Sequence, residues 1–257
     1  MAEAAHHRSL IYRSTAGLAA LAAVAGALAG ARPAAADDAE RPDFTGVWGT
    51  YREPGQAGAF GRGGPEELAL KPEARRKVEA YEALVAPTGD TPGGFCLGTG
   101  MPGSMLGSGG YPMGIVQHDD VIVVIYEAHA EVRHIYLGDN RVPEEDLFPD
   151  RNGYSVGRWE GDKLIVETTH LKEAVDQRRY PHSDQARIVE EYELVTNEDG
   201  SKVLVANMTM TDPAFYTEPV TAEKKWSFLP GVRLLPYECN EPAWEEHLDA
   251  LREQAAN

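Results

Sequence analysis

The sequence predicts a single, mainly β domain, an antiparallel barrel or meander with one internal helix and a C-terminal helix. Three observations carry this prediction. About eight short β-type segments follow residue 44, and tight turns join most of them. Inside the chain, helical spacing of apolar residues is convincing over 71–84 alone. No Gly-rich phosphate loop follows a predicted strand, which disfavours the nucleotide-binding α/β folds.

The first residues predict a secretory signal peptide. Arg8 and Arg13 precede an uncharged Ala/Gly/Leu stretch over 16–31, and small residues end the segment at Ala36. The alternative is an uncleaved anchor, but a spanning helix needs about 20 apolar residues, more than this stretch offers. We expect residues 1–36 to be a signal peptide and 37–257 to be one periplasmic or secreted domain, with no stable membrane insertion after cleavage.

The charge of the chain excludes some partners. The sequence has 24 Lys and Arg against 41 Asp and Glu, a net charge of −17. The leader holds three arginines and one glutamate, so the mature chain is more acidic still. Such a surface repels phosphate backbones and anionic lipid headgroups. We therefore expect a small organic ligand or substrate as the partner and no nucleic acid.

The first half of the chain supplies an opening strand at 44–49 and the predicted helix at 71–84, which has Pro72 in its first turn. A Gly- and Pro-rich loop follows over 86–112. Runs of β-branched residues with turn residues between them then predict strands. These are 114–117, 121–127 and 131–137.

The second half continues as hairpins. Gly161 and Asp162 form a strong turn signal between two segments with strand character. The remaining predicted elements are strands at 154–159, 163–168, 186–195, 202–211, 223–229 and 233–237, and a helix over 242–256.

Two groups of residues resemble known families. Residues 43–48, DFTGVW, resemble the opening Gly-x-Trp strand of lipocalin-like (calycin) barrels. Residues 157–168, GRWEGDKLIVET, are similar to a β-hairpin that recurs in a group of secreted bacterial proteins of unassigned function. The second resemblance extends to 100–102, 133–136, 180–184, 212–213 and Cys239. It implies a mainly β fold and a cell-envelope location, and it transfers no chemistry.

The first candidate site lies on the hairpin around residue 130. In a regular strand, Glu127 shares a face with three apolar residues of 121–125, and Arg133 is the nearest cation across the turn. We expect both to face the barrel interior, where Glu127 would move a proton and Arg133 would stabilise negative charge. Tyr154 would orient the substrate. The alternative is a surface ion pair, and the other face of 121–126 is nearly as apolar.

The second candidate is His182, because histidine is the side chain best suited to proton transfer near neutral pH. Asp184 follows two residues later and is assigned to ligand contact, although these residues can instead stabilise a turn. A barrel mouth lined by aromatic side chains suits a partly apolar ligand. The further residues assigned to ligand contact are Tyr136, His134 and Trp159.

The sequence predicts no metal and no cofactor. Five histidines of the β region and Met101, Met105 and Met113 near Cys96 leave a metal site as an alternative. No His-x-His, His-x-x-x-His or His-Glu-x-x-His spacing supports that alternative in this region.

Three functions fit these residues. The first is an extracytoplasmic enzyme that uses acid–base side chains in a barrel cavity without a nucleotide cofactor. The second is a periplasmic binding or carrier protein for a small apolar ligand in the same cavity. The third is an envelope protein with a filled barrel and a structural role.

Cys96 and Cys239 are the two cysteines, and an oxidising compartment favours one disulfide between them over metal ligation. Cys96→Ser should lower the melting temperature and leave one free thiol, since the bridge closes a loop longer than half the chain. Thiol titration of the denatured, non-reduced protein checks this. Two free thiols in the wild type would contradict the prediction.

Overall fold

The structure is a computed structural model that describes residues 41–52, 68–106, 110–176 and 178–240, together with residues 246, 248–249 and 251–253. The predicted signal peptide, residues 1–36, lies outside the described residues. Within those that are described, no helix has the length and apolar character needed to cross a membrane.

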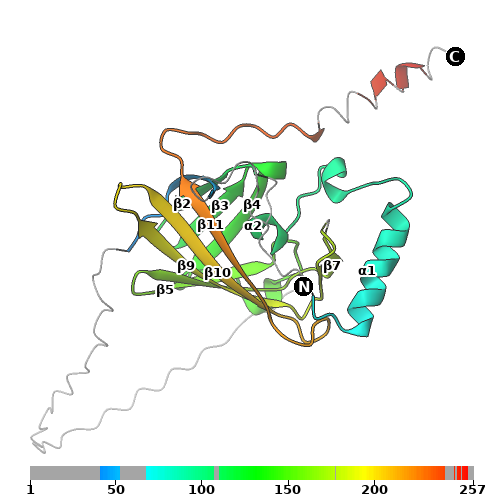
Figure 1. Cartoon of the computed structure of the whole chain (residues 1–257), viewed down its shortest axis with the longest axis horizontal. Coiled ribbons are helices and arrows are strands. Elements are labelled where there is room, and N and C mark those ends of the chain that lie inside the picture. Colours follow the sequence, from blue (N-terminus) through cyan, green and yellow to red (C-terminus); the bar gives the residue numbers. More distant parts are fainter. Residues whose placement is uncertain are drawn as a thin grey trace, which may run out of the picture. The chain divides into compact units, whose positions relative to one another are not determined.

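Nine strands of the described chain form a closed barrel (Figure 1). The first strand pairs with both the second and the last, which closes the sheet. All barrel pairings are antiparallel except the parallel pair formed by the fourth and fifth strands. In order around the barrel the strands are β1 (Gly46–Thr50), β11 (Val220–Phe228), β10 (Lys202–Thr211), β9 (Arg187–Thr196), β6 (Lys163–Thr169), β5 (Tyr154–Glu160), β4 (Glu131–Leu137), β3 (Val121–Tyr126) and β2 (Met113–Gln117).

The predicted mainly β fold with a lipocalin-like barrel is confirmed. The predicted internal helix is α1 (Pro72–Val85), and residues 251–253 near the C-terminus are helical as expected. The prediction of a strand at 233–237 is wrong, because this segment pairs with no strand. Short elements form instead within predicted loops: η1 (Pro92–Phe95), α2 (Gly103–Leu106), η2 (Ala128–Ala130), η3 (Glu144–Asp146), β7 (Ala174–Val175) and β8 (Pro181–His182).

Alternation along the strands decides which side chains face the barrel interior. On β3 the buried residues are Ile122, Val124 and Tyr126. The register pairs Val124 with Arg133 and Tyr126 with Glu131 on β4. Since paired residues point to the same side of a sheet, two charged residues of β4 point inward with the apolar face of β3.

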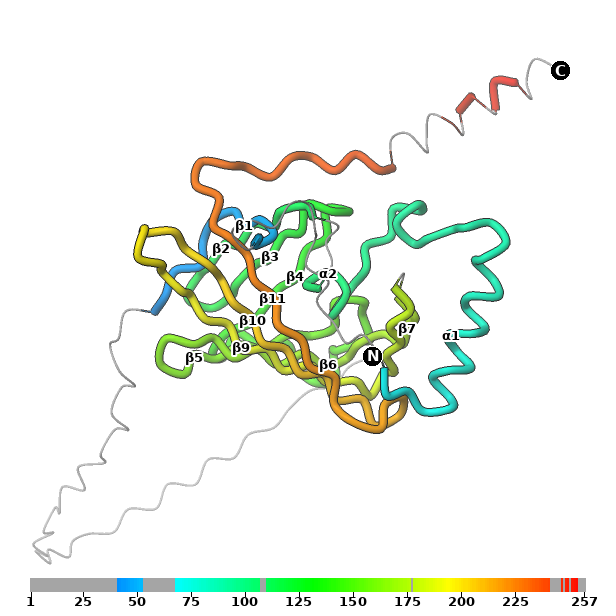
Figure 2. The backbone as a smooth tube through the Cα atoms, in the orientation of Figure 1, coloured from blue at the N-terminus to red at the C-terminus, as the bar shows by residue number. Residues whose placement is uncertain are grey.

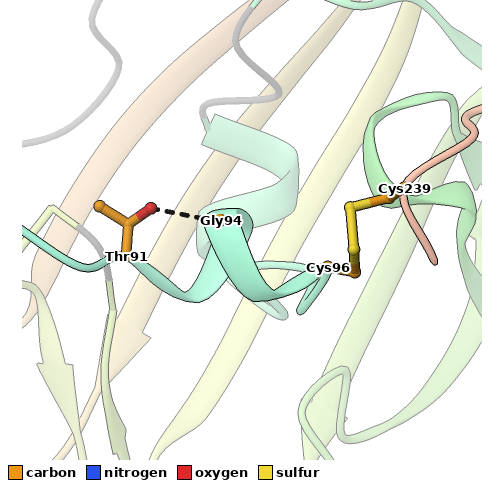
Figure 3. Close-up of a disulfide and its surroundings, with 4 residues drawn as sticks. All are labelled: Thr91, Gly94, Cys96 and Cys239. Carbon is orange, nitrogen blue, oxygen red and sulfur yellow. Dashed lines mark hydrogen bonds between the residues drawn. A yellow bond between two sulfur atoms is a disulfide. The ribbon is translucent and has the colours of Figure 1, made fainter. Parts of the chain in front are cut away.

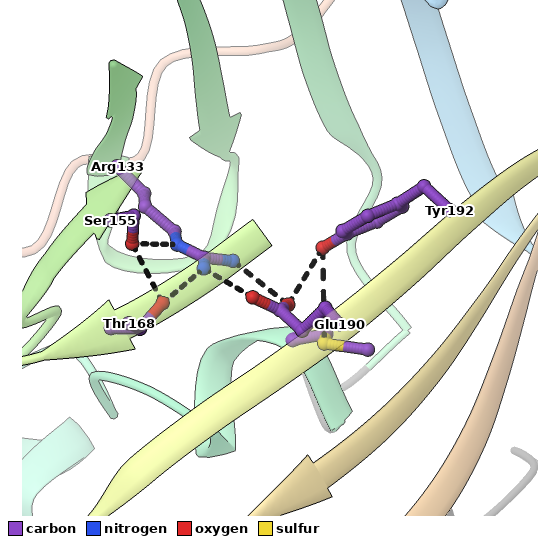
Figure 4. Close-up of polar contacts among 6 residues, drawn as sticks. Arg133, Ser155, Thr168, Glu190 and Tyr192 are labelled. Carbon is purple, nitrogen blue, oxygen red and sulfur yellow. Dashed lines mark hydrogen bonds and ion pairs between the residues drawn. The ribbon is translucent and has the colours of Figure 1, made fainter. Parts of the chain in front are cut away.

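Arg133 holds the centre of a polar cluster inside the barrel (Figure 4). Its side chain is 1% exposed, and it forms an ion pair with Glu190 of β9, whose side chain is 0% exposed. Arg133 Nη1 donates to Glu190 Oε1 at 3.0 Å, and Nη2 donates to both Glu190 Oε2 and Thr168 Oγ1. Ser155 accepts from Nε at 3.0 Å, and Tyr192 donates to Glu190 at 2.8 Å.

The cluster compensates charges that burial would otherwise disfavour. Burial alone would lower the pKa of Arg133, but the adjacent Glu190 carboxylate outweighs burial and raises it above its ordinary value. Burial also raises the pKa of Tyr126, to about 12. Both side chains therefore keep their protons throughout the physiological pH range.

A C-terminal strap, residues 229–240, runs from the end of β11 along the outside of the barrel (Figure 2). Leu229 N donates to Val47 O at 2.8 Å, and the ring of Tyr237 lies 4.9 Å from that of His129. The strap ends in a disulfide between Cys239 and Cys96, which confirms the predicted bridge (Figure 3). The disulfide thereby joins the loop at 92–99 to the strap, which follows the last barrel strand, β11.

The Arg133–Glu190 pair gives a stability prediction. Glu190→Gln removes one charge and leaves a buried guanidinium uncompensated, so it should lower the free energy of unfolding by about 3–5 kcal/mol. The matched control is Glu73→Gln, which breaks an exposed pair with Arg76 and should lower it by less than about 1 kcal/mol. Urea denaturation measures both. Equal, small losses would show that the buried pair does not need its carboxylate.

Candidate functional site

Glu127 lies outside the barrel, so the expectation that it faces the interior with Arg133 is wrong. It follows β3 in the turn before β4 and is half-buried. Its Oε2 accepts a hydrogen bond from Leu235 N in the strap at 2.7 Å. The strand face that ends in Glu127 is the outer one, because its three apolar residues are only half-buried, whereas those of the other face belong to the core. The inward carboxylate of this hairpin is Glu131.

Arg133 faces inward as expected, but it meets protein groups there. Its donors already bond Glu190, Thr168 and Ser155, as described above. A substrate oxygen would have to displace one of these partners inside the core. The geometry therefore favours a structural role for Arg133.

The other predicted residues divide between the two faces of the barrel. Trp159 points inward and packs on Phe44, with ring centroids 5.4 Å apart. Tyr154, Tyr136 and His134 point outward and form a row of rings on the outside of the barrel. Asp184 is exposed. His182, a proton-transfer candidate, lines a pocket.

This pocket, called here the hairpin pocket, has a volume of about 70 Å³. It lies between the β7–β8 hairpin and the loop that the disulfide ties down. Figure 1 shows the hairpin between the barrel and α1, and α1 contacts both of its strands. The pocket is lined by Pro92, Leu97, Gly98, Thr99, Arg151, Lys172, Ala174, Val175, Asp176 and His182.

Asp176 brings an unsatisfied carboxylate oxygen to the pocket. Its Oδ1 accepts hydrogen bonds from the backbone N–H groups of Arg178 and Tyr180, each at 2.8 Å. Its Oδ2 is buried and has no hydrogen-bond partner among the described residues. Burial raises the pKa of Asp176 above its ordinary value, and the two backbone hydrogen bonds oppose the shift only in part. Gly103 packs closely on the pocket wall, because a Cβ there would clash with Thr99 Cγ2 and come 3.3 Å from Asp176 Oδ2.

His182 is held with a defined ring orientation. Its Nε2 lies 3.0 Å from the carbonyl oxygen of Lys172, so Nε2 carries the proton of the neutral ring and donates it. Nδ1 then holds the lone pair, and within the described chain it makes no hydrogen bond. Burial lowers the pKa of His182 and outweighs the raising influence of the Lys172 carbonyl.

The register of the hairpin places the two groups on one face. Ala174 pairs with His182, and Asp176 follows Ala174 by two residues, so Asp176 and His182 are diagonal neighbours. Diagonal neighbours in an antiparallel pair lie about 7–8 Å apart. The pocket of about 70 Å³ is smaller than the usual small-ligand site of about 300–1,000 Å³, so it admits one small functional group of a ligand between the two side chains. A carboxyl with a raised pKa and an imidazole with a lowered pKa form a suitable acid and base.

Two further groups add polarity to the pocket. Arg151 brings a guanidinium whose Nη1 donates to Gly98 O, and Thr99 brings a hydroxyl. Pro92, Leu97 and Val175 supply apolar walls. In the described part of the chain, no three His, Cys, Asp or Glu side chains gather in a way that would hold a metal ion.

The sequence matches no protein-family model, and no curated protein matches it either. The assignment of a site therefore depends on the geometry of the chain itself. Asp176 is the functional candidate that sequence reasoning missed. A carboxylate six residues before His182, across the turn of a short hairpin, was the available signal.

The unsatisfied oxygen of Asp176 predicts a pH-dependent stability difference. Because the folded state raises the pKa of Asp176 above 3.8, its contribution to stability is complete below that pH and is lost as the pH rises through the raised value. Asp176→Asn keeps the Oδ1 acceptor and cannot ionise. Its melting temperature should equal that of the wild type near pH 3.5 and exceed it increasingly towards pH 7. A constant difference across this range would contradict the burial argument.

Proposed function

We propose that this protein is an extracytoplasmic enzyme that performs acid–base chemistry on a small organic molecule held in the hairpin pocket. The observation that carries the proposal is the buried Oδ2 of Asp176, which has no partner among the described residues and lies on the same hairpin face as His182. Unpaired buried oxygens are unfavourable in a folded protein, and a bound donor would relieve this one. The site lies beside the barrel, whereas the sequence had indicated its interior.

The two side chains divide the work by their protonation states. His182 is neutral near physiological pH and presents a lone pair at Nδ1, so it takes a proton from the substrate. Asp176 keeps its proton to higher pH than an ordinary carboxyl and returns one to a second substrate atom. The substrate loses one proton to His182 and gains one from Asp176, so it is isomerised with no net change in protons. Exchange with water then removes the proton from His182 and returns one to Asp176, and no nucleotide cofactor is needed. Arg151 stands at the pocket wall, where its charge favours the anionic intermediate.

The proposed location of the protein and the class of its partner are supported by its disulfide and its net charge. The Cys96–Cys239 disulfide supports a periplasmic or secreted location, in agreement with the signal peptide that the sequence predicts at 1–36. The net charge of −17 supports a small-molecule partner and opposes binding to nucleic acid. The hairpin with the GRWEGD sequence, β5–β6, supports membership of the secreted bacterial group that it resembles.

A carrier function is the second candidate, and the apolar walls at Pro92, Leu97 and Val175 favour it. The same pocket would then hold an apolar group without changing it. Turnover distinguishes the two functions, because a carrier releases its ligand unaltered.

The experiment starts from small molecules extracted from the envelope of the producing cell, incubated with the protein and followed by mass spectrometry and NMR. Asp176→Asn and His182→Gln should each slow conversion at least about 100-fold, in the range of lost acid–base catalysis. The controls are Asp184→Asn and His118→Gln, which change exposed residues of the same types and should keep the wild-type rate.

The pH profile adds a second readout. The rate should follow a bell-shaped curve, because the reaction needs His182 without its second proton and Asp176 with its proton; burial favours both of these forms. Wild-type rates in both pocket variants would refute the enzyme proposal. A molecule that binds and is recovered unchanged would establish the carrier.

A further inference from the structure

A second concavity lies on the outer face of the barrel. The loop over 138–150 and the outward side chains of β5 and β6 enclose a groove of about 430 Å³, called here the loop groove. This volume is within the range of small-ligand sites, about 300–1,000 Å³. No described residue lines both the loop groove and the hairpin pocket, so the two are treated as separate sites.

The charges of the loop groove balance, although the whole chain has a net charge of −17. Its lining contains Arg141 and Arg158 against Glu144 and Glu167. Three of these side chains already have partners of opposite charge: Arg158 with Glu160 at 2.7 Å, Glu167 with Arg187, and Glu144 with His170 at 3.3 Å when that ring is protonated. A charged ligand would meet both signs at once, so the groove favours an uncharged ligand with many hydrogen-bonding groups.

A row of aromatic rings starts at the edge of the loop groove. Tyr154 lines the groove, and its hydroxyl accepts a hydrogen bond from Val142 N at 2.8 Å, which fixes the ring against the loop. The Tyr136 ring lies 5.3 Å from that of Tyr154. His134 continues the row, with its ring 6.2 Å from Tyr136 and tilted by only 20°. Tyr136 pairs with Val156 of the groove, so the row leaves the groove across β4.

These rings are not buried in the core. His134 is exposed, and Tyr136 and Tyr154 are half-buried on the outside of the barrel. A ring face carries partial negative charge and attracts C–H groups that carry partial positive charge. Rings beside a balanced set of carboxylates and guanidinium groups therefore suit a ligand with both flat C–H faces and many hydroxyls.

We propose that the loop groove binds a neutral oligosaccharide. One sugar ring lies in the groove, where its hydroxyls donate to Glu144 and accept from Arg141, both at the exposed rim. The next sugar ring stacks its C–H face on Tyr136. Hydrogen bonds to charged side chains are stronger than those between neutral groups, which gives the ligand a defined orientation.

The test uses isothermal titration of the full mature chain with maltotetraose, cellotetraose and chitotetraose, and with tri-galacturonic acid as the anionic comparison. At least one neutral oligosaccharide should bind, and more tightly than the anionic one. Tyr136→Ala should weaken this binding at least tenfold. Tyr81→Ala, an aromatic residue on α1 outside the groove, is the matched control and should leave the affinity unchanged.

Melting curves show whether each variant is folded, and Tyr154→Phe adds a second measure. It keeps the ring and removes the hydroxyl that holds the loop, so binding should weaken while stacking on Tyr136 remains. The proposal is overturned if none of the neutral oligosaccharides binds, if Tyr136→Ala binds as well as the wild type, or if the anionic trimer binds best. Loss of turnover in the hairpin-pocket variants has no bearing on this outcome, so the two sites are tested separately.

Discussion

A guanidinium that is 1% exposed stands inside the barrel, and the arrangement of four strands depends on it. Arg133 of β4 takes its partners from β5, β6 and β9, namely Ser155, Thr168 and Glu190. A slip of one residue in any of these strands would turn its polar side chain to the outside and leave the charge unpaired. The ion pair therefore specifies the register of this side of the barrel, in addition to whatever stability it contributes.

The position of most strands could be predicted from the sequence, because the signals are local. Turn residues such as Gly161 and alternating β-branched residues act over a few positions, and the structure places strands close to the predicted bounds. Which side of β3 faces the barrel interior could not be predicted, since the residues on both of its sides are apolar. The partner of Arg133 was equally hidden, because Glu190 lies 57 residues further along the chain.

Only one of the two acid–base residues of the candidate site could be predicted from the sequence, because the other depends on contacts made in the folded chain. A histidine attracts notice in any sequence, so His182 was identified, whereas Asp176 looked like one of many acidic residues in a chain with 41. Its raised pKa arises from burial in the folded chain, and residue type does not show that. For Trp159 and Tyr154 the sequence predicted one shared ligand site, which is wrong. Both are aromatic residues of β5, but alternation along the strand turns Trp159 into the core and Tyr154 to the outer face.

The strap has a consequence for how the molecule is made and degraded. Every barrel strand precedes residue 229, whereas Cys239, which holds the pocket loop through Cys96, lies beyond the last of them. During synthesis, the barrel sequence is therefore complete before the pocket wall can be fastened. In the finished protein, one proteolytic cut in the strap would release that wall from β11 and leave all nine barrel strands in one piece. Such a cut would loosen the loop at 92–99 while that loop stays joined to the barrel strands through the backbone on both of its sides.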